Sequence, residues 1–254
     1  MKASLIYLSG VVAIAAMAAA AVEGRAQGTQ SQQQLTRFSV GVSAMLSDPR
    51  GDFGHNIGNG FGADGNFVYH IDRAGWLGLR FDGSGFSYGR ERKQAPYSQT
   101  LGRVRADVTT TNFLGGISIG PELALPKGPI RPYVSAAFSG LFLRTTSSLK
   151  GSGSSDGSVA STTNFKDNTR AGVYGAGVRI PLRNSGIHPT LDLGIRYHRG
   201  GQASYLREGS IQDNPDGTIS FVPLNSRTPY IGYVAGIRFR IPFDSRRSCP
   251  RWVC

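Results

Sequence analysis

The stretch GYVAGIRFRIPF, residues 232–243, constrains the fold of this chain more than any other segment. A period of two is typical of a β-strand whose two faces meet different surroundings. Here the apolar residues recur at every second position, and two of the intervening positions hold Arg238 and Arg240; the apolar set is Tyr233, Ala235, Ile237, Phe239, Ile241 and Phe243. The pattern therefore predicts a strand with one wholly apolar face and one cationic face.

The N-terminus has the pattern of an export signal. A positive start at Lys2 precedes an apolar, alanine-rich run over residues 5–22, and small residues then surround Arg25. Signal peptidases cleave after such small residues, so we expect cleavage after Ala26. The alternative is a retained membrane anchor, because the apolar run is near the minimum length for spanning a bilayer. The absence of a cysteine near the cleavage site argues against a lipoprotein signal.

The composition is unusual for a soluble domain. Glycine contributes 35 of 254 residues, charged residues only 17% and aromatic residues 10%, which favours closely spaced β-strands. The formal net charge is +12. For an exported chain, such a charge indicates an anionic membrane surface rather than nucleic acid as the partner. No stretch beyond the leader is long and apolar enough for a transmembrane helix.

Eight segments have strand character: residues 36–46, 60–71, 75–88, near 108–120, near 131–144, 170–180, 189–200 and 232–243. The connections between them alternate in length. Three are short or bounded by proline and glycine, at residues 71–75, 121–132 and 181–189. The other four are longer and polar, at residues 47–58, 89–106, 145–168 and 199–228.

An even strand count, with short turns at one end and long loops at the other, is typical of an outer-membrane barrel. Strands of this length cross a thin bilayer when tilted, and closure satisfies every backbone group in lipid. The sequence therefore predicts an all-β fold, an eight-stranded antiparallel up-and-down transmembrane barrel over residues 36–243. It would follow a signal peptide (1–26) and a flexible lead (27–35), and precede a periplasmic tail (244–254). We expect the short turns to face the periplasm and the long loops the outside.

The alternative fold is a soluble β-sandwich or lipocalin-like barrel with its apolar face inward. The charged residues in the middle of the strands argue against it. In a membrane barrel they would line a narrow lumen as a polar network in which opposite charges pair. The expected members are Asp64, Arg80, Asp82, Asp192, Arg196, Arg238 and Arg240, with Trp76 facing the same space. Because arginines outnumber carboxylates in this set, some are expected to reach water or the barrel ends.

With these features the chain resembles the small eight-stranded outer-membrane barrels: the OmpA membrane domain, OmpX/Ail-type proteins and the OmpW group. The segment YIGYVAGIRFRIPF is similar to the C-terminal assembly signal of that family, which the outer-membrane insertion machinery reads. The sequence departs from the family because DSRRSCPRWVC follows Phe243. The resemblance implies a monomer in the outer membrane of a Gram-negative-type bacterium, in contact with outer-membrane lipid and lipopolysaccharide.

The sequence offers little for catalysis. Ser87 and Ser118 each fit the pattern G-x-S-x-G, but neither precedes the helix that a nucleophile elbow needs. The histidines, His55, His70, His188 and His198, have no zinc-site spacing, so no metal or cofactor is expected. His70 and His198 are expected to be hydrogen-bonding groups of the polar lumen. A lipid-modifying enzyme would need a pair such as His198 with Ser204, which only their proximity supports.

Two further features concern the ends of the molecule. Cys249 and Cys254 are expected to form a small disulfide loop, because the exported compartment permits it and two cysteines allow one pairing. A set of basic loop residues would either contact lipopolysaccharide phosphates or form a solvated face: Arg90, Arg92, Lys93, Arg103, Arg105 and Lys166. We therefore expect a structural, envelope-integrity or surface-interaction role, with a narrow pore for small solutes as the alternative and a lipid-modifying enzyme as a distant one.

Overall fold

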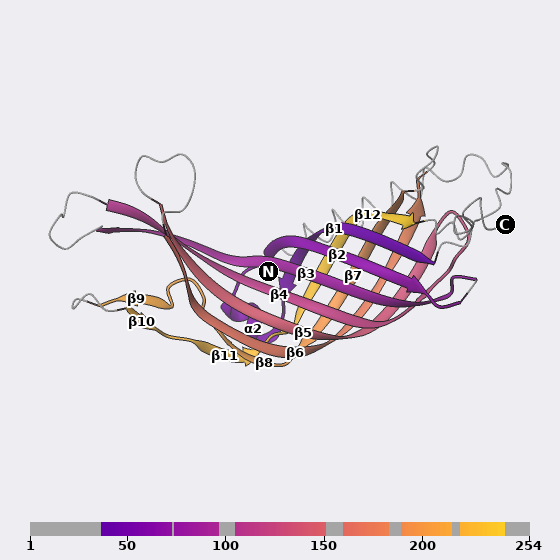
Figure 1. Cartoon of the computed structure of the whole chain (residues 1–254). Coiled ribbons are helices and arrows are strands. Elements are labelled where there is room, and N and C mark those ends of the chain that lie inside the picture. The colour runs from indigo at the N-terminus through magenta and orange to yellow at the C-terminus, as the bar shows by residue number, and fades with distance from the viewer. Residues whose placement is uncertain are drawn as a thin grey trace, which may run out of the picture. The chain divides into compact units, whose positions relative to one another are not determined.

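A computed structural model describes residues 37–72, 74–96, 105–150, 160–182, 189–214 and 219–241. Within this part of the chain, eight strands form one closed antiparallel barrel in the order β1-β12-β7-β6-β5-β4-β3-β2 (Figure 1). They are β1 (Phe38–Pro49), β2 (Gly60–His70), β3 (Leu77–Pro96), β4 (Arg105–Ala124), β5 (Arg131–Lys150), β6 (Ala160–Pro181), β7 (Thr190–Gly200) and β12 (Tyr230–Ile241). The predicted fold class is confirmed.

The barrel closes between its first and last strands. The register of β1 and β12 runs without interruption from Phe38 opposite Ile241 to Pro49 opposite Tyr230. Because β1 also pairs with β2 on its other side, the barrel wall has no free strand edge at this seam. A closed wall of this kind pairs its backbone groups within the sheet, as a wall in contact with lipid requires.

Along each wall strand, side chains alternate between the lumen and the outside. In β12, Val234 and Arg238 are buried in the lumen, whereas Ile237 and Phe239 are exposed on the outer surface. Large apolar side chains are the ones left outside elsewhere too, with Ile117 70% exposed and Phe61 69% exposed. The buried set includes aspartates, arginines and a glutamate. This is the reverse of a soluble barrel, so the alternative with an inward apolar face is wrong.

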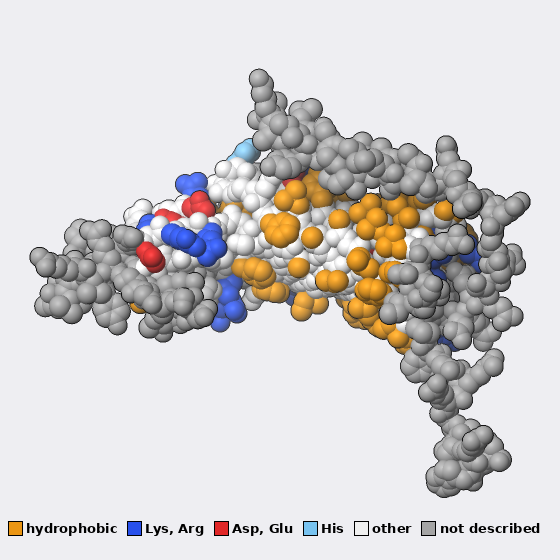
Figure 2. Space-filling view, turned by 90° about the horizontal axis from the view of Figure 1, so that it is seen from above, with side chains coloured by type: hydrophobic (Ala, Val, Ile, Leu, Met, Phe, Trp, Pro, Cys, Tyr) orange, Lys and Arg blue, Asp and Glu red, His pale blue; other side chains and the backbone are white. Residues whose placement is uncertain are grey.

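The apolar side chains gather into a broad band over the barrel wall, and charged side chains collect beyond the band toward the long loops (Figure 2). An exposed apolar surface this extensive marks a membrane-facing region. No helix in the described residues is long and apolar enough to cross a membrane.

Strands β3 to β6 continue well past their neighbours at the end of the barrel that carries the long connections (Figure 1). Pairing between β2 and β3 stops at Phe61 and Ser87, but β3 and β4 remain paired as far as Pro96 and Arg105. The prediction of loops over 89–106 and 145–168 was therefore wrong in the paired parts. The extensions of β4, β5 and β6 are rich in threonine and serine, and that of β3 is rich in charged residues, so they lack the apolar alternation that marks a strand. Hydroxyls nevertheless join the strands, as between Thr110 and Ser147 at 2.7 Å.

Short elements lie at the same end, within connections that were predicted as loops. Helix α2 (Gly51–Asn56) follows β1. Between β7 and β12, β8 (Gln202–Tyr205) pairs with β11 (Leu224–Arg227), and β9 (Ile211–Asp213) pairs with β10 (Ile219–Phe221). We call this the loop end of the barrel, and the opposite end, with the short connections after β2, β4 and β6, the turn end. The predicted signal peptide, lead-in and tail lie outside the described residues, as does Phe243.

Candidate functional site in the barrel lumen

Every wall strand contributes a polar or charged side chain to the half of the lumen at the turn end. The alternation of each strand aims these residues inward, and an eight-stranded barrel leaves only enough room for side chains to fill. All are buried: Ser39 from β1, Asp64 from β2, Arg80 and Asp82 from β3, Glu122 from β4, Tyr133 from β5, Arg179 from β6, Asp192 and Arg196 from β7, and Arg238 from β12.

Eight of these side chains form one continuous series of ion pairs in which acids and bases alternate. We call it the ionic chain, and its order is Asp64, Arg196, Asp82, Arg80, Glu122, Arg179, Asp192, Arg238. After the contact of Arg196 with Asp64, the successive nitrogen–oxygen distances are 3.1, 2.7, 2.8, 2.5, 3.6 and 3.0 Å. Four carboxylates and four guanidinium groups leave the ionic chain with no net charge.

The alternation explains how so many charges are tolerated away from water. Burying an ion costs several kcal/mol, and only a partner of opposite charge with good hydrogen bonds offsets that cost. Each interior member of the ionic chain has such a partner on both sides. Arg238 at one end also donates from Nη1 to the Ser39 hydroxyl at 3.1 Å, and Ser118 donates to Asp82 at 3.3 Å.

Tyr133 holds the middle of this half in place. Its hydroxyl donates to Asp192 at 2.9 Å, and the guanidinium carbon of Arg179 lies 4.1 Å from its ring centroid. Two glycines on the neighbouring strands make room for the ring: a Cβ on Gly177 or on Gly194 would lie 2.6 Å from the tyrosine hydroxyl oxygen. The side chain of Tyr133 therefore fits at this place only because both positions are glycine.

The structure places six of the predicted lumen residues in the ionic chain, namely Asp64, Arg80, Asp82, Asp192, Arg196 and Arg238. Arg240 is half-buried and lies outside the ionic chain, on the side of the turn end of the barrel. Sequence reasoning missed two members. Glu122 was assigned to a turn, whereas β4 runs on to Ala124. Arg179 lies two residues after Gly177 on β6, so strand alternation places both on the lumen face and could have revealed the arginine. These two additions, one acid and one base, cancel each other, so the ionic chain is balanced because Arg240 lies outside it.

The expectation that Trp76 faces the lumen was wrong. Its side chain is 53% exposed, and it precedes β3, which begins at Leu77. Trp76 belongs to the turn before the strand, where its backbone N–H donates to the Asp72 carboxylate at 3.0 Å. This bond and a second one from the Leu77 N–H lower the pKa of Asp72, with the Leu77 bond the stronger cause. Strand alternation therefore does not extend to this position.

The half of the lumen at the loop end is mainly apolar, and its few buried polar side chains include Asn112 and Thr145, where the threonine hydroxyl donates to the amide oxygen at 2.7 Å. Its buried members come from the wall and from the loops, and they include Met45, Phe53, Phe86, Leu114, Leu141, Leu143, Tyr205, Tyr230 and Val234. Helix α2 inserts Phe53, which is fully buried, with its ring 5.0 Å from Tyr205 and 6.0 Å from Tyr88, centroid to centroid. We call this set the apolar plug. Together with the ionic chain it fills the lumen with side chains.

The residues weighed for catalysis are not arranged for it. His198 faces the lumen as expected, but it stacks on Tyr230 with ring centroids 4.1 Å apart, and neither ring nitrogen has a hydrogen-bond partner among the described residues. It is thus not a hydrogen-bonding group of the polar lumen. Ser204 accepts a hydrogen bond from Asn225 rather than facing His198. Ser87 and Ser118 lie within β3 and β4, where no helix follows them.

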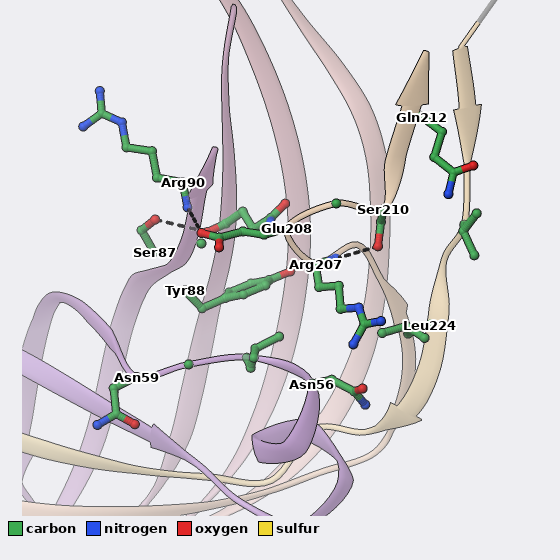
Figure 3. Close-up of a pocket in the computed structure, with 16 residues that line it drawn as sticks. Asn56, Asn59, Ser87, Tyr88, Arg90, Arg207, Glu208, Ser210, Gln212 and Leu224 are labelled. Atoms are coloured by element: carbon green, nitrogen blue, oxygen red, sulfur yellow. Dashed lines mark hydrogen bonds between the residues drawn. The ribbon is translucent and has the colours of Figure 1, made fainter. Parts of the chain in front are cut away.

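A cleft of about 860 Å³ opens over the apolar plug at the loop end (Figure 3). Its walls are the segment after α2, the bulge of β3 and the connection between β8 and β9. The polar lining residues are Asn56, Asn59, Ser87, Tyr88, Arg90, Asn112, Arg207, Glu208, Ser210 and Gln212. The connection is pinned to β3, because the Arg90 N–H donates to Glu208 at 3.0 Å and the Gly209 N–H to Glu91 at 3.0 Å. That bond from Gly209 is the main cause of a lowered pKa at Glu91.

The remaining expectations concern metal binding, the tail disulfide and the basic loop residues. No group of three or more histidine, cysteine, aspartate or glutamate side chains there could hold a metal ion. Cys249, Cys254 and Arg103 lie outside the described residues, and the side chain of Arg105 is not described either. The expected tail disulfide therefore stays a prediction.

A closed antiparallel barrel with charges inside and an apolar band outside belongs to one class of proteins, the eight-stranded transmembrane β-barrels of outer membranes. No protein-family model matches the chain, and no curated protein sequence matches it.

Solved structures with a similar fold come from several bacteria. OprG from Pseudomonas aeruginosa is 12% identical with a TM-score of 0.45, and covers 81% of this chain and 96% of its own. Neisserial surface protein A is 16% identical with a TM-score of 0.44 (80% and 97%). Ail of Yersinia pestis is 11% identical with a TM-score of 0.42 (80% and 97%). These similarities are too distant to bear on function.

Proposed function

We propose that this protein is a non-conducting outer-membrane barrel that serves at the cell surface, in envelope integrity or surface interaction, and not in transport or catalysis. The observation that carries the proposal is the filled lumen, in which the ionic chain and the apolar plug lie in series. Solutes would have to displace buried ions in one half and a packed aromatic cluster in the other, and both changes are costly.

The extensions of β3 to β6 support a role outside the membrane. They continue beyond the end of β2 by nine residues on β3, from Tyr88 to Pro96, and carry polar side chains on both faces. The cleft at the loop end adds a recess lined by carboxamide, hydroxyl and charged groups. This end of the protein therefore offers surface for recognition while the wall provides the anchor.

We further propose lipopolysaccharide as the lipid partner of this surface. Arg144 stands opposite Phe113 on one side and Lys166 on the other, on the face that continues the lipid-facing wall. Arg90, Arg92 and Arg170 have the same outward phase, whereas Glu91 and Asp167 point to the other face, where they bind backbone N–H groups of the loops. Cations just beyond an apolar band suit the phosphates of an outer-leaflet lipid.

The lipid assignment can be tested by reconstitution. We expect lipopolysaccharide, added to phospholipid vesicles, to raise the unfolding temperature of the wild-type protein, read by its heat-modified gel mobility. The triple variant Arg144→Gln, Lys166→Gln, Arg170→Gln should lose most of this rise. A matched control, Arg207→Gln with Arg227→Gln, removes exposed cations of the loops and should keep it. An equal rise in the triple variant would contradict the proposal.

A further inference from the structure

A small cavity lies at the turn end of the lumen, beyond the ionic chain. Its volume is about 20 Å³. The polar side chains that matter for its chemistry are His70, Arg131, Arg179, Thr190, Arg238 and Arg240. No carboxylate lines it within the described part of the chain, although carboxylates are plentiful one layer deeper in the lumen.

The charges around this cavity do not balance. Arg179 and Arg238 share the carboxylates of the ionic chain, which is already neutral. Among the described residues, Arg240 has no hydrogen bond or ion pair, and the Arg131 side chain donates only to the Gly128 carbonyl, at 3.2 Å. Arg131 and Arg179, both cations, line the same cavity as Arg240. For the residues that the structure describes, the turn end of the lumen therefore holds an excess of positive charge.

An anion would resolve this excess. Half-buried guanidinium groups with no acid partner are costly, and each carries five N–H donors that need acceptors. His70 also lines the cavity, and its buried Nδ1 has no partner among the described residues. The hydroxyl of Thr190, a buried residue, is a further donor at the cavity.

The size of the cavity restricts the ligand. A volume of roughly 10–15 Å³ on this measure holds one water molecule. The cavity therefore accommodates one particle of about that size and excludes a bulky polyatomic anion. We propose that it binds a single monatomic halide, chloride under ordinary conditions, held chiefly by Arg131 and Arg240 as the counter-ion of the turn end of the lumen.

Anion-dependent stability tests this site. The unfolding temperature of the purified, folded protein should rise as chloride replaces gluconate at constant ionic strength. Ligand linkage predicts a rise of about 5–10 °C at a hundredfold excess over the dissociation constant. Bromide should act like chloride. Arg240→Gln should abolish the response, whereas Arg227→Gln, which removes an exposed cation at the loop end, should retain it.

Anomalous scattering from bromide-grown crystals of the wild-type protein gives a readout that needs no variant. One peak within contact of Arg131 and Arg240 is expected. An unfolding temperature that is the same in chloride and gluconate would overturn the proposal, as would a wild-type crystal with no bromide at this cavity. Equal stabilisation by sulfate that also depends on Arg240 would overturn the monatomic assignment.

Discussion

The two halves of the lumen fill the same cylinder by opposite chemistry. At the turn end, eight ionised side chains alternate in one neutral series. At the loop end, aromatic and aliphatic side chains pack around Phe53. The first half is stabilised by ion pairing, because each buried ion is tolerated only while its oppositely charged neighbours are present. The second half is held by packing, which depends on shape and volume.

This difference predicts how each half responds to mutation. In the turn-end half, removing charge without changing shape should be severe. In the loop-end half, removing volume without touching a charge should be severe. The wall also supplies an internal reference, because residues of the same type face lipid on the same strands.

The largest effect is expected for Glu122→Gln in the turn-end half. The amide keeps the shape of Glu122 but removes the charge that neutralises Arg80 and Arg179 together. Breaking a buried pair in this way costs about 3–5 kcal/mol of unfolding free energy. Urea unfolding in phospholipid vesicles measures the loss. The control Asp107→Asn changes an exposed acid on the same strand and should be neutral; an equally neutral Glu122→Gln would show that packing alone holds this half.

A somewhat smaller loss is expected for Leu141→Ala in the loop-end half. Leu141 is 1% exposed within the apolar plug, so truncation removes apolar contact and leaves a cavity, at about 2–5 kcal/mol. Leu123→Ala is the matched control because Leu123 is 55% exposed on the outer face of the wall and leaves no cavity. Equal losses in the two variants, measured by the same urea titration, would mean that the loop-end half is loosely packed.

Gly194→Ala tests the link between Tyr133 and the ionic chain. The new methyl group would lie 2.6 Å from the Tyr133 hydroxyl oxygen and should displace it from Asp192. Overpacking of this kind costs about 1–3 kcal/mol. Gly83→Ala makes the same change where nothing lies within 4 Å, so it should cost little. If both variants unfold at the same urea concentration, the Tyr133 side chain can accommodate the added methyl group, and the close contact expected from the structure is contradicted.

The smallest effect is local and depends on pH. The Gly209 N–H bond, helped by Lys93, holds the pKa of Glu91 below its ordinary value of 4.5. A lowered pKa in the folded state stabilises the contact above pH 4.5, and this contribution is lost as the pH falls through the folded value. Protection of the Gly209 amide from hydrogen exchange should therefore drop below that pH in the wild-type protein. In Glu91→Gln it should be low and unchanged across the range; wild-type protection that does not change would refute the contact.

The same comparison shows what the sequence could reveal. Charged residues such as Asp82 and Arg238 stand out against apolar neighbours, so their inward position follows from alternation. The loop-end half does not stand out. There Leu114 and Leu141 face the lumen while Phe113 and Phe142 face outward, and with apolar residues on both faces the period of two disappears. Glu122 was missed for another reason, because prolines at positions 121 and 126 indicated a turn that begins only after Ala124.

The decisive measurement is planar-bilayer recording from the pure wild-type protein. If the ionic chain and the apolar plug fill the lumen in series, the folded protein should show no stable, porin-sized conductance. Glu122→Gln and Phe53→Ala, each of which loosens one half only, should remain closed, and combining them should be the first change to admit ions. Large and stable conductance from the wild-type protein would contradict the filled lumen and establish the barrel as a pore.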